Sequence, residues 1–580
     1  MRPSQAVAQH GPGSIVDLPQ LSVIMAGIDY WYPGDLDRVH EPRLERFLGV
    51  DSMFGAPRSA PGVRGGLPSF VFPESLVCPH ARCRKLAHHR NFRRKGKDDS
   101  LHFVCTNSAV HSKFPTAFPA RFLVACPRGH IDDFPWKEWV HSGESPCNGE
   151  LTLTDTGRSG GAQDIVVSCR GCGKKRSMAG AFRAGAHSRC TGRQPWLGLG
   201  VRADGCSERP RTLLRGASNS YFSVVASALS IPPWSDPIHQ DLVPFAQVIR
   251  QATSLEQFQA GVAGGFYNLG GLLNRYSVRE IWDAFHNEPT AEDLKSLEWE
   301  AFTNPERPVP PGSEYEVSSR EVPPTYAENI SQVVAATRLR EVRALRGFMR
   351  IDPIPDTGDS DDVAALGTRT APLSRHDEPS WLPAVDLRGE GIFIRLDESR
   401  LRHWEHSPSV SSACKDVELS WNMWREERGL SKKEFPGMRY VVIHTLSHLL
   451  IRQLSFDSGY SSSSIRERLY VSDDPDSPMA GLLLYTATSD SDGSLGGLVD
   501  QAKPDRLSLL IGRALEDACV CAQDPLCGGS AAGGSDTLNG AACHACLLIA
   551  ETSCEFANRL LDRGAIVGTI GGLGIEFFRV

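Results

Sequence analysis

The sequence lacks four features that would indicate common functions or locations. It has no GxxxxGK[ST] phosphate-binding loop, so we expect no ATP hydrolysis by this chain alone. It has no dinucleotide-binding fingerprint, which disfavours a Rossmann-type enzyme. No run approaches the ~18 apolar residues that cross a bilayer, and MRPSQAVAQHGPGSIVDLP has no signal-peptide pattern. We therefore expect a cytoplasmic protein that is not an enzyme by itself.

The composition is that of a folded chain with an uneven charge. Hydrophobic residues make up 41% and charged residues 23% of the 580 positions. At roughly 150 residues per domain, this length suggests about four units. The net charge is −7, yet residues 78–215 hold 24 Lys and Arg against 11 Asp and Glu, a local charge of +13. A basic block inside an acidic chain is typical of a nucleic-acid contact.

The sixteen cysteines are concentrated in two parts of the chain. Nine precede residue 207 and six follow residue 518. In a reducing cytosol such clusters indicate metal ligation rather than disulfides. Zinc prefers four ligands in a tetrahedron, and a closed site of this kind is structural, because a catalytic zinc keeps one position open. We predict two or three structural Zn²⁺ ions.

In the C-terminal cysteine cluster, Cys543 and Cys546 form a C-x-x-C turn that can supply two thiolates to one ion. The cluster has one cysteine more than a single zinc needs. The predicted ligands are Cys527, Cys543, Cys546 and Cys554, with Cys521 as the alternative to Cys527.

The cysteines of the basic block allow two further zinc sites, whose pairing the sequence leaves open. Cys169 and Cys172 form a zinc-knuckle turn. The candidate partners are Cys190 and Cys206, or Cys147, for this turn, and the second set is Cys78, Cys83, Cys105 and Cys126, with His130 as a competing ligand.

The same block offers basic side chains that could contact a DNA backbone, although a solvated surface is the alternative interpretation. The candidates for DNA binding are Arg90, Arg93, Arg94, Lys95, Lys97, Lys174, Lys175 and Arg176.

The pattern of strands and helices predicts an α+β multidomain fold, with a zinc-ribbon-like N-terminal half, a helical middle and an α/β C-terminal zinc-binding module. The stretch YFSVVASALSIPPW is predicted as a strand, and residues 239–303 as helices. Residues 327–351 are predicted as a further helix. The expected units are an N-terminal cap (1–77), a basic zinc-ribbon region (78–215), a helical region (216–330), a helix plus mobile linker (331–430) and the C-terminal module (431–580).

Within the C-terminal module, RYVVIHTLSHLLIRQL predicts a buried helix, and GLLLYTAT and AIVGTIG predict strands. His444 and His448 are four residues apart on that helix. The zinc-protease pattern requires a glutamate after the first histidine, and Thr445 stands there instead. We therefore expect buried, hydrogen-bonded histidines.

Three C-terminal segments carry a resemblance to a known module: HTLSHLLIRQL, LLLYTATSDSDGSLGGLV and CHACLLIAETSCEFANRLLDR. Together, over roughly residues 435–580, they resemble a module attached to the C-terminus of some superfamily 2 helicases, in which four cysteines hold a zinc. The resemblance implies ligands at Cys543, Cys546 and Cys554, with the fourth at Cys521 or Cys527.

Upstream, GPGSIVDLP, CPRGHIDDFPW, RGASNSYFSVVASALSIPPW and REVRALRGFMRI extend a resemblance across nearly the whole chain. They are similar to the DrmB family of the bacterial DISARM anti-phage system. The resemblance implies a heterodimer with a DrmA-type superfamily 2 helicase, and a DNA-binding complex that acts on phage DNA, single-stranded or containing a junction. The motor itself is missing here, so the expected role is that of an accessory subunit.

Two other functions remain as alternatives. A metal-dependent nuclease could use Asp490 and Asp492 with the two histidines, provided that they lie together around an open metal position. A zinc-finger regulator could bind DNA without any helicase, although the large C-terminal module argues against it.

Overall fold

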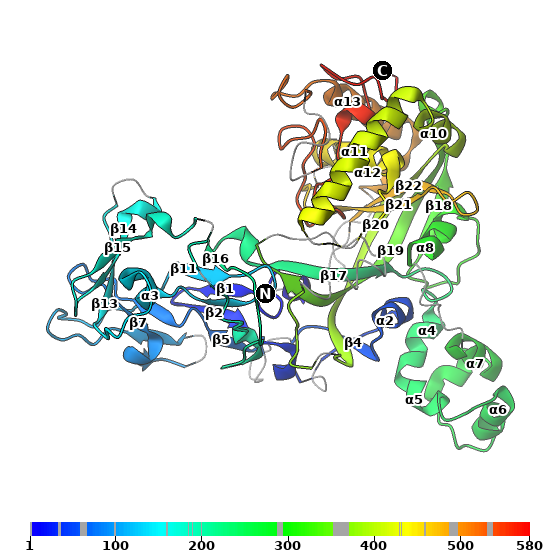
Figure 1. Cartoon of the computed structure of the whole chain (residues 1–580). Helices are drawn as coiled ribbons and strands as arrows, with labels where there is room; N and C mark the ends of the chain where they lie inside the picture. The colour runs from blue at the N-terminus through cyan, green and yellow to red at the C-terminus, as the bar shows by residue number, and fades with distance from the viewer. Residues whose placement is uncertain are drawn as a thin grey trace.

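The computed structural model describes residues 3–579, except 33–35, 58–65, 98–99, 158–160, 184, 188, 199, 287–293, 352–369, 377, 429, 431, 458–459, 487–496 and 530–537. Figure 1 shows a β-rich N-terminal part, a C-terminal part with long helices, and a small helical lobe, with long strands running between them. Helices and several sheets are mixed, which confirms the predicted α+β class. No described helix is long and apolar enough to cross a membrane.

A large, mainly antiparallel sheet links the N-terminal and C-terminal parts of the chain. Its central strands are far longer than the usual strand of five or six residues. Its main order is β17 (Phe222–Leu229), β19 (Ile330–Met349), β20 (Trp381–Leu396), β22 (Met479–Thr486) and β21 (Ile465–Ser472), with β18 (Glu316–Arg320) on β19 and the pair β3 (Arg38–Val39) and β4 (Ser52–Phe54) on β20. The predicted strands at YFSVVASALSIPPW and GLLLYTAT are confirmed as β17 and β22.

The helix predicted over residues 327–351 is wrong, because this stretch forms strand β19. Its Ala, Leu and Arg residues favour helices, but pairing with β17 and β20 overrides that preference. The register shifts between Ile330 and Gln332 and again between Ala336 and Leu339. Each bulge adds a residue and breaks the alternation that would have indicated a strand. The apolar residues therefore fall at spacings that resemble a helix.

The N-terminal part consists of small sheets, as expected for a region of cysteine turns. Strands form within the segments FLVACPRGH, GELTLTD and QDIVVSCRGCGKK. The strands are β1 (Ile15–Leu18), β2 (Leu21–Met25) and β5 (Ser69–Val71); β10 (Phe118–Pro119), β6 (Ser75–Val77), β7 (Lys85–His88), β13 (Leu151–Asp155), β14 (Ile165–Cys169) and β15 (Lys175–Ser177); β12 (Ile131–Asp133), β11 (Phe122–Ala125) and β16 (Arg211–Leu214); and the hairpin β8 (Arg93–Lys95) and β9 (His102–Val104). Three short helices accompany them: α1 (Pro3–Ala8), α2 (Pro42–Leu48) and α3 (Trp136–His141).

The middle of the chain is helical between residues 237 and 303, which confirms that prediction for the described residues. Helices α4 to α7 enclose a small core around Ile249, Phe258 and Ile281. Helix α8 instead packs Phe302 against Phe393 of the long sheet, with stacked rings 5.1 Å apart. The helices are α4 (Pro237–Leu242), α5 (Ala246–Ile249), α6 (Leu255–Ala263), α7 (Val278–His286) and α8 (Leu294–Thr303).

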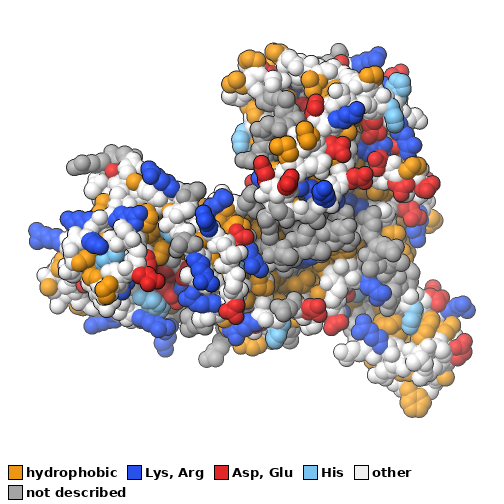
Figure 2. Space-filling model, viewed as in Figure 1, with side chains coloured by type: hydrophobic (Ala, Val, Ile, Leu, Met, Phe, Trp, Pro, Cys, Tyr) orange, Lys and Arg blue, Asp and Glu red, His pale blue; other side chains and the backbone are white. Residues whose placement is uncertain are grey.

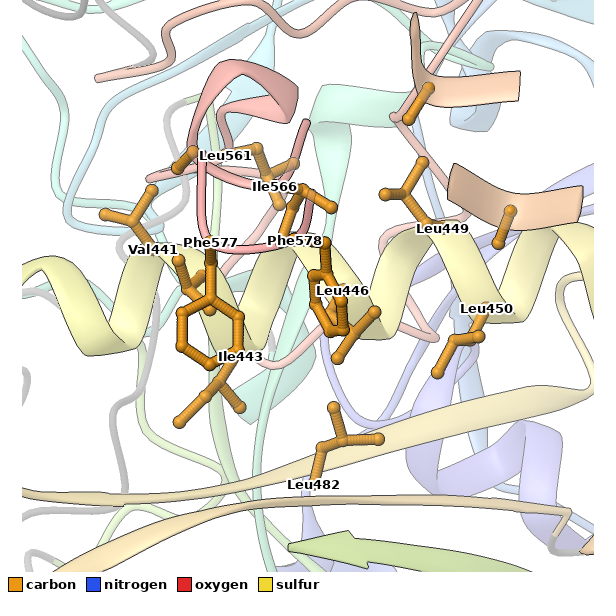
Figure 3. Close-up of a cluster of buried hydrophobic side chains, with 14 of the residues drawn as sticks. Val441, Ile443, Leu446, Leu449, Leu450, Leu482, Leu561, Ile566, Phe577 and Phe578 are labelled. Atoms are coloured by element: carbon orange, nitrogen blue, oxygen red, sulfur yellow. The ribbon is translucent and has the colours of Figure 1, made fainter. Parts of the chain in front are cut away.

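The C-terminal part is organised around a buried helix, as predicted. Figure 3 shows how apolar side chains of this helix meet strand β22 on one side and Phe577 and Phe578 from the chain end on another. Because it is covered on several sides, the helix is apolar around most of its surface. The helices here are α10 (Glu398–Glu405), α11 (Pro408–Glu427), α12 (Gly437–Asp457) and α13 (Pro504–Cys519).

The strand predicted at AIVGTIG, residues 565–571, is wrong. The chain forms a 3-10 turn at Arg563–Ala565 and continues without a strand. Ile566 and Val567 are fully buried in the core of the C-terminal part. Their apolar character reflects packing against α12 rather than pairing in a sheet.

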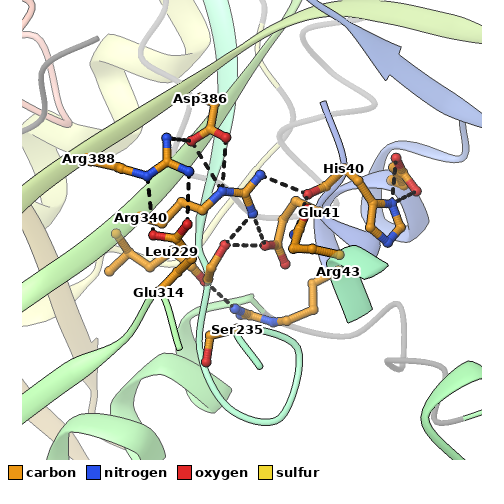
Figure 4. A network of polar contacts seen from close by, with 12 residues as sticks. His40, Glu41, Arg43, Leu229, Ser235, Glu314, Arg340, Asp386 and Arg388 are labelled. Atoms are coloured by element: carbon orange, nitrogen blue, oxygen red, sulfur yellow. Dashed lines mark hydrogen bonds and ion pairs between the residues drawn. The ribbon is translucent and has the colours of Figure 1, made fainter. Parts of the chain in front are cut away.

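A buried polar network fixes the start of the chain to the long sheet (Figure 4). Arg340 of β19 is 3% exposed and donates to both carboxylate oxygens of Asp386 on β20 at 3.1 Å. It also donates to Ser230 Oγ and to the carbonyl oxygen of His40, at 2.9 and 3.0 Å. A guanidinium buried this deeply needs such partners, because an unpaired charge would be very costly.

Candidate metal centres and a basic surface

Four C-terminal thiols come together after helix α13. The Cys521 and Cys543 sulfurs lie 3.5 Å apart, and Cys546 Sγ lies 3.7 Å from both Cys527 Sγ and Cys543 Sγ. The C-x-x-C turn supplies two of them, as the sequence predicts. Both alternatives for the fourth ligand, Cys521 and Cys527, are present, whereas Cys554 belongs to another set.

A second set of donors is buried in the N-terminal part. It consists of Cys126, His130, Cys190 and Cys206. His130 Nδ1 lies 3.4 Å from Cys126 Sγ and 3.6 Å from Cys190 Sγ. His130, which the sequence suggests as a competing ligand, is therefore one of the four donors of this set. Cys126 lies here rather than with Cys78, Cys83 and Cys105, and Cys190 and Cys206 lie here rather than with the Cys169–Cys172 turn.

The third set, Cys78, Cys83, Cys105 and His111, is built from the ends of short strands. Cys78 follows β6 directly and its sulfur lies 3.5 Å from His111 Nε2. The sulfurs of Cys83 and Cys105 are 3.9 Å apart. Cys105 follows β9 directly, so this set lies at the base of the β8–β9 hairpin.

The fourth set, His141, Cys147, Cys169 and Cys172, contains the zinc-knuckle turn. Cys147 Sγ lies 3.6 Å from Cys169 Sγ, and Cys172 Sγ lies 3.3 Å from His141 Nε2. The other ring nitrogen of His141 donates to the Lys137 carbonyl at 2.7 Å. This bond leaves Nε2 free of a proton and directed at the thiols, as metal-binding histidines require.

Local contacts favour the thiolate form of one cysteine in the second set and of one in the fourth, whereas the hydrogen bond to Cys190 raises the pKa of its neighbour Cys126. The neighbouring thiol of Cys126, followed by His130, lowers the pKa of Cys190 to about 4. The backbone N–H of Cys172 is the main reason that the pKa of Cys169 falls to about 6. Because the thiolate is the form that binds metal, these surroundings are suited to an ion.

The sequence interpretation missed His111 and His141. A signal was available, because Cys147, Cys169 and Cys172 form a triple that lacks a fourth donor, and His141 precedes the first of them by six residues. His111 likewise follows Cys105 by six residues. The pairing of Cys126 with Cys206, by contrast, depends on how distant segments fold together.

All these sets are closed arrangements of four donors. Their composition, Cys₄ or Cys₃His, is the one that structural zinc sites use. We therefore assign structural zinc as the cofactor with which they are compatible. In the N-terminal part, where the strands are short, an ion in each set would join separate segments of the chain.

A fifth set brings together the two histidines of α12 with Glu467 and Cys554. His444, His448 and Glu467 are completely buried, so a nucleic acid could not reach them as a nuclease requires. Asp490 and Asp492, the carboxylates of the nuclease alternative, lie outside the described residues, as does most of the expected linker (352–369).

The basic candidates divide into two kinds. Arg90, Arg93, Arg94, Lys95 and Lys97 are all exposed on or beside the β8–β9 hairpin. Figure 2 shows Lys and Arg side chains spread over the N-terminal part of the molecule. Lys174 and Lys175 are also exposed.

Arg176, by contrast, has a structural role. It lies 3.6 Å from the centre of the Trp139 ring and donates to the Trp139 carbonyl oxygen at 3.0 Å. A guanidinium held by these two contacts on α3 is less available to DNA than Lys174 and Lys175, which precede it.

Comparison with known proteins finds family matches in two separate parts of the chain. Residues 446–547 match a family described as the MrfA Zn-binding domain, a range that contains all four thiols of the first set but not Cys554. Residues 2–222 match a family described only as a domain of unknown function, DUF8724. The chain is 32% identical over 581 residues to the DISARM protein DrmB of Bacillus paralicheniformis, covering 96% of this chain and 98% of that protein.

Proposed function

Because this chain belongs to the family of the DISARM protein DrmB, we propose that it is a non-catalytic accessory subunit of a DISARM anti-phage defence complex. In this proposal it pairs with a DrmA-type superfamily 2 helicase, binds DNA, and modulates the DNA engagement and ATPase activity of that motor. The structural metal centres hold the binding surfaces in place rather than taking part in a reaction.

The observation that carries the proposal of DNA binding is the exposed basic β8–β9 hairpin. Its base contains the third set of metal donors, which includes Cys105. Arg93, Arg94 and Lys95 make up β8, which pairs with β9 immediately before Cys105. A zinc ion at this base would stiffen a hairpin that has only two short strands. A rigid row of cations is suited to the phosphate backbone, which binds them with release of counterions.

A second metal-donor turn, followed by exposed cations, lies beside Cys83 in the base of the hairpin. Arg170 of the zinc-knuckle turn donates to the carbonyl oxygen of Cys83 at 2.8 Å. The two metal-donor sets are therefore in direct contact through this side chain, and Lys174 and Lys175 follow on the exit of the turn.

An aromatic side chain accompanies the cations. The Arg93 guanidinium lies 5.4 Å from the centre of the Phe114 ring, and Phe114 is 41% exposed. Proteins that bind single strands combine such cations with exposed rings on which bases stack. This pair favours a DNA substrate with unpaired bases.

The experiment replaces the hairpin cations together, as Arg93→Gln, Arg94→Gln, Lys95→Gln and Lys97→Gln, in the full chain. Affinity for a single-stranded oligonucleotide is measured by fluorescence anisotropy at several salt concentrations. The slope of log affinity against log salt should become less negative by about 0.7 for each phosphate of the single strand that the variant no longer neutralises. Since the four side chains are exposed, the fold should be unaffected.

The matched control replaces Arg250 and Arg279 by Gln, since both are exposed on the helical lobe away from the metal sets. This control should retain the affinity and slope of the unmodified chain. Unchanged binding in the hairpin variant, with its zinc content intact, would show that the hairpin is not the DNA contact.

A further inference from the structure

The set formed by His444, His448, Glu467 and Cys554 joins three separate segments of the C-terminal part. The two histidines are one turn apart on α12, Glu467 is on β21, and Cys554 comes from the loop that follows the four-thiolate cluster. His444, His448 and Glu467 are 0% exposed. A group of four polar side chains at this depth requires a physical explanation.

The donor atoms lie nearly as far apart as the ligands of a tetrahedral zinc ion. His444 Nε2 lies 3.1 Å from Glu467 Oε1 and 3.2 Å from Cys554 Sγ, and His448 Nε2 lies 3.6 Å from Glu467 Oε1. Ligands about 2.0–2.3 Å from a central zinc are separated by about 3.3–3.8 Å in a tetrahedron. The neighbouring thiolate cluster has sulfur separations of 3.5 and 3.7 Å.

The orientation of His448 is the second observation. Its Nδ1 lies 3.0 Å from the Leu547 carbonyl oxygen, to which it donates, so Nε2 carries a lone pair. That Nε2 atom is buried and has no hydrogen-bond partner among the described residues. A backbone carbonyl that fixes one ring nitrogen while the other faces inward is the arrangement around metal-bound histidines.

Cys554 and Glu467 are also held in place, in their case by hydrogen bonds that they accept. The backbone N–H groups of Phe556 and Asn558 both donate to Cys554 Sγ, at 3.3 and 3.2 Å. Ser447 Oγ and the Glu555 N–H donate to the two carboxylate oxygens of Glu467. These bonds stabilise negative charge on both side chains, and a thiolate and a carboxylate with two neutral imidazoles would balance the charge of a divalent cation.

We propose that His444, His448, Glu467 and Cys554 bind a second zinc ion in the C-terminal part, distinct from the ion of Cys521, Cys527, Cys543 and Cys546. The site is closed and structural, and it fixes helix α12 to strand β21 and to the loop at Cys554. It also lies next to the four-thiolate cluster, because the Leu547 carbonyl that orients His448 belongs to the residue after Cys546.

The direct test is an anomalous difference map at the zinc absorption edge, from crystals of the unmodified full chain. We expect a peak between His444 Nε2, Glu467 Oε1 and Cys554 Sγ, in addition to the peak among the four thiols. A peak at the four thiols with none at the histidines would overturn the proposal and leave a buried hydrogen-bonded cluster. The four-thiolate peak serves as the internal control.

Metal counting on variants provides a second measurement. Native mass spectrometry should find one zinc fewer in Cys554→Ala and in His448→Ala than in the unmodified chain. Cys546→Ser should lose a different ion, so that the Cys546→Ser, Cys554→Ala double variant loses two. If Cys554→Ala and His448→Ala are both soluble and keep the zinc count of the unmodified chain, the second site does not exist.

Discussion

The Arg468 side chain on β21 meets Glu298 on α8, with 2.8 Å between Nη2 and Oε1, and the carboxylate is completely buried. Glu298 also accepts from the Leu229 N–H and from the Tyr470 hydroxyl, at 3.0 and 3.1 Å. Arg43 of α2 approaches the same carboxylate at 3.6 Å. One anion therefore joins α2, α8, β17 and β21, the elements that hold the lobes of the protein together.

We expect Glu298→Ala to destabilise the chain strongly. The substitution leaves the guanidinium groups of Arg43 and Arg468 buried without their carboxylate, which typically costs about 3–5 kcal/mol. Urea unfolding followed by circular dichroism measures the loss. Glu300→Ala, at an exposed position of the same helix, should change stability by less than about 0.5 kcal/mol. Equal stability of the two variants would contradict a role of this ion network in joining the lobes.

Replacement of one four-thiolate ligand should remove an ion and loosen the C-terminal part. Cys546→Ser is expected to lower the zinc content by one ion and to expose the loops after α13, because zinc binding supplies about 10–16 kcal/mol to small sites of this kind. Elemental analysis and limited proteolysis measure the two effects. Cys414→Ser is the control, since Cys414 is on α11 outside the described donor sets. Retention of all zinc by Cys546→Ser would exclude this ligand assignment.

The helical lobe should lose stability in mild acid. Burial, and then the charge of His40, lowers the pKa of His239 from 6.5 to about 4. Below pH 6.5 His239 becomes protonated in the unfolded chain, whereas in the folded chain it stays neutral until about pH 4. The free energy of unfolding is therefore unaffected by His239 above pH 6.5. It falls as the pH decreases from 6.5 to about 4, by up to roughly 3 kcal/mol.

The measurement compares thermal midpoints at pH 7.5 and pH 5.0 for the unmodified chain and for His239→Gln. The variant should have a smaller difference between the two pH values. His286→Gln, at an exposed histidine of α7, should behave as the unmodified chain. The same acid shift in all three proteins would show that His239 is not its source.

The metal-binding regions could be found from the sequence, whereas the ligand sets could not. Clustered cysteines and the Cys543–Cys546 turn are local patterns, and they identify both regions. Cys554 is only eight residues from Cys546, so the sequence analysis assigned both to one zinc ion. The structure places Cys554 beside His444, 110 residues earlier, because α12 runs through the core under this loop.

The long strands show a similar limit. Local composition favours a helix at β19, and only the partners on both sides, β17 and β20, make an extended chain favourable. Three tryptophans in polar or proline-rich segments, Trp136, Trp139 and Trp234, are buried as well. Burial of a single aromatic depends on the whole fold and has no local signature.

The measurement that tests the proposed function most directly is co-expression of this chain with the DrmA-type helicase of the same defence system. A partnership without a covalent link needs an interface of about 1,600 Å² of buried surface. The account predicts that the two chains co-elute on gel filtration at micromolar concentration and that the DNA-dependent ATPase rate of the helicase changes on mixing. Separate elution together with an unchanged ATPase rate would contradict it.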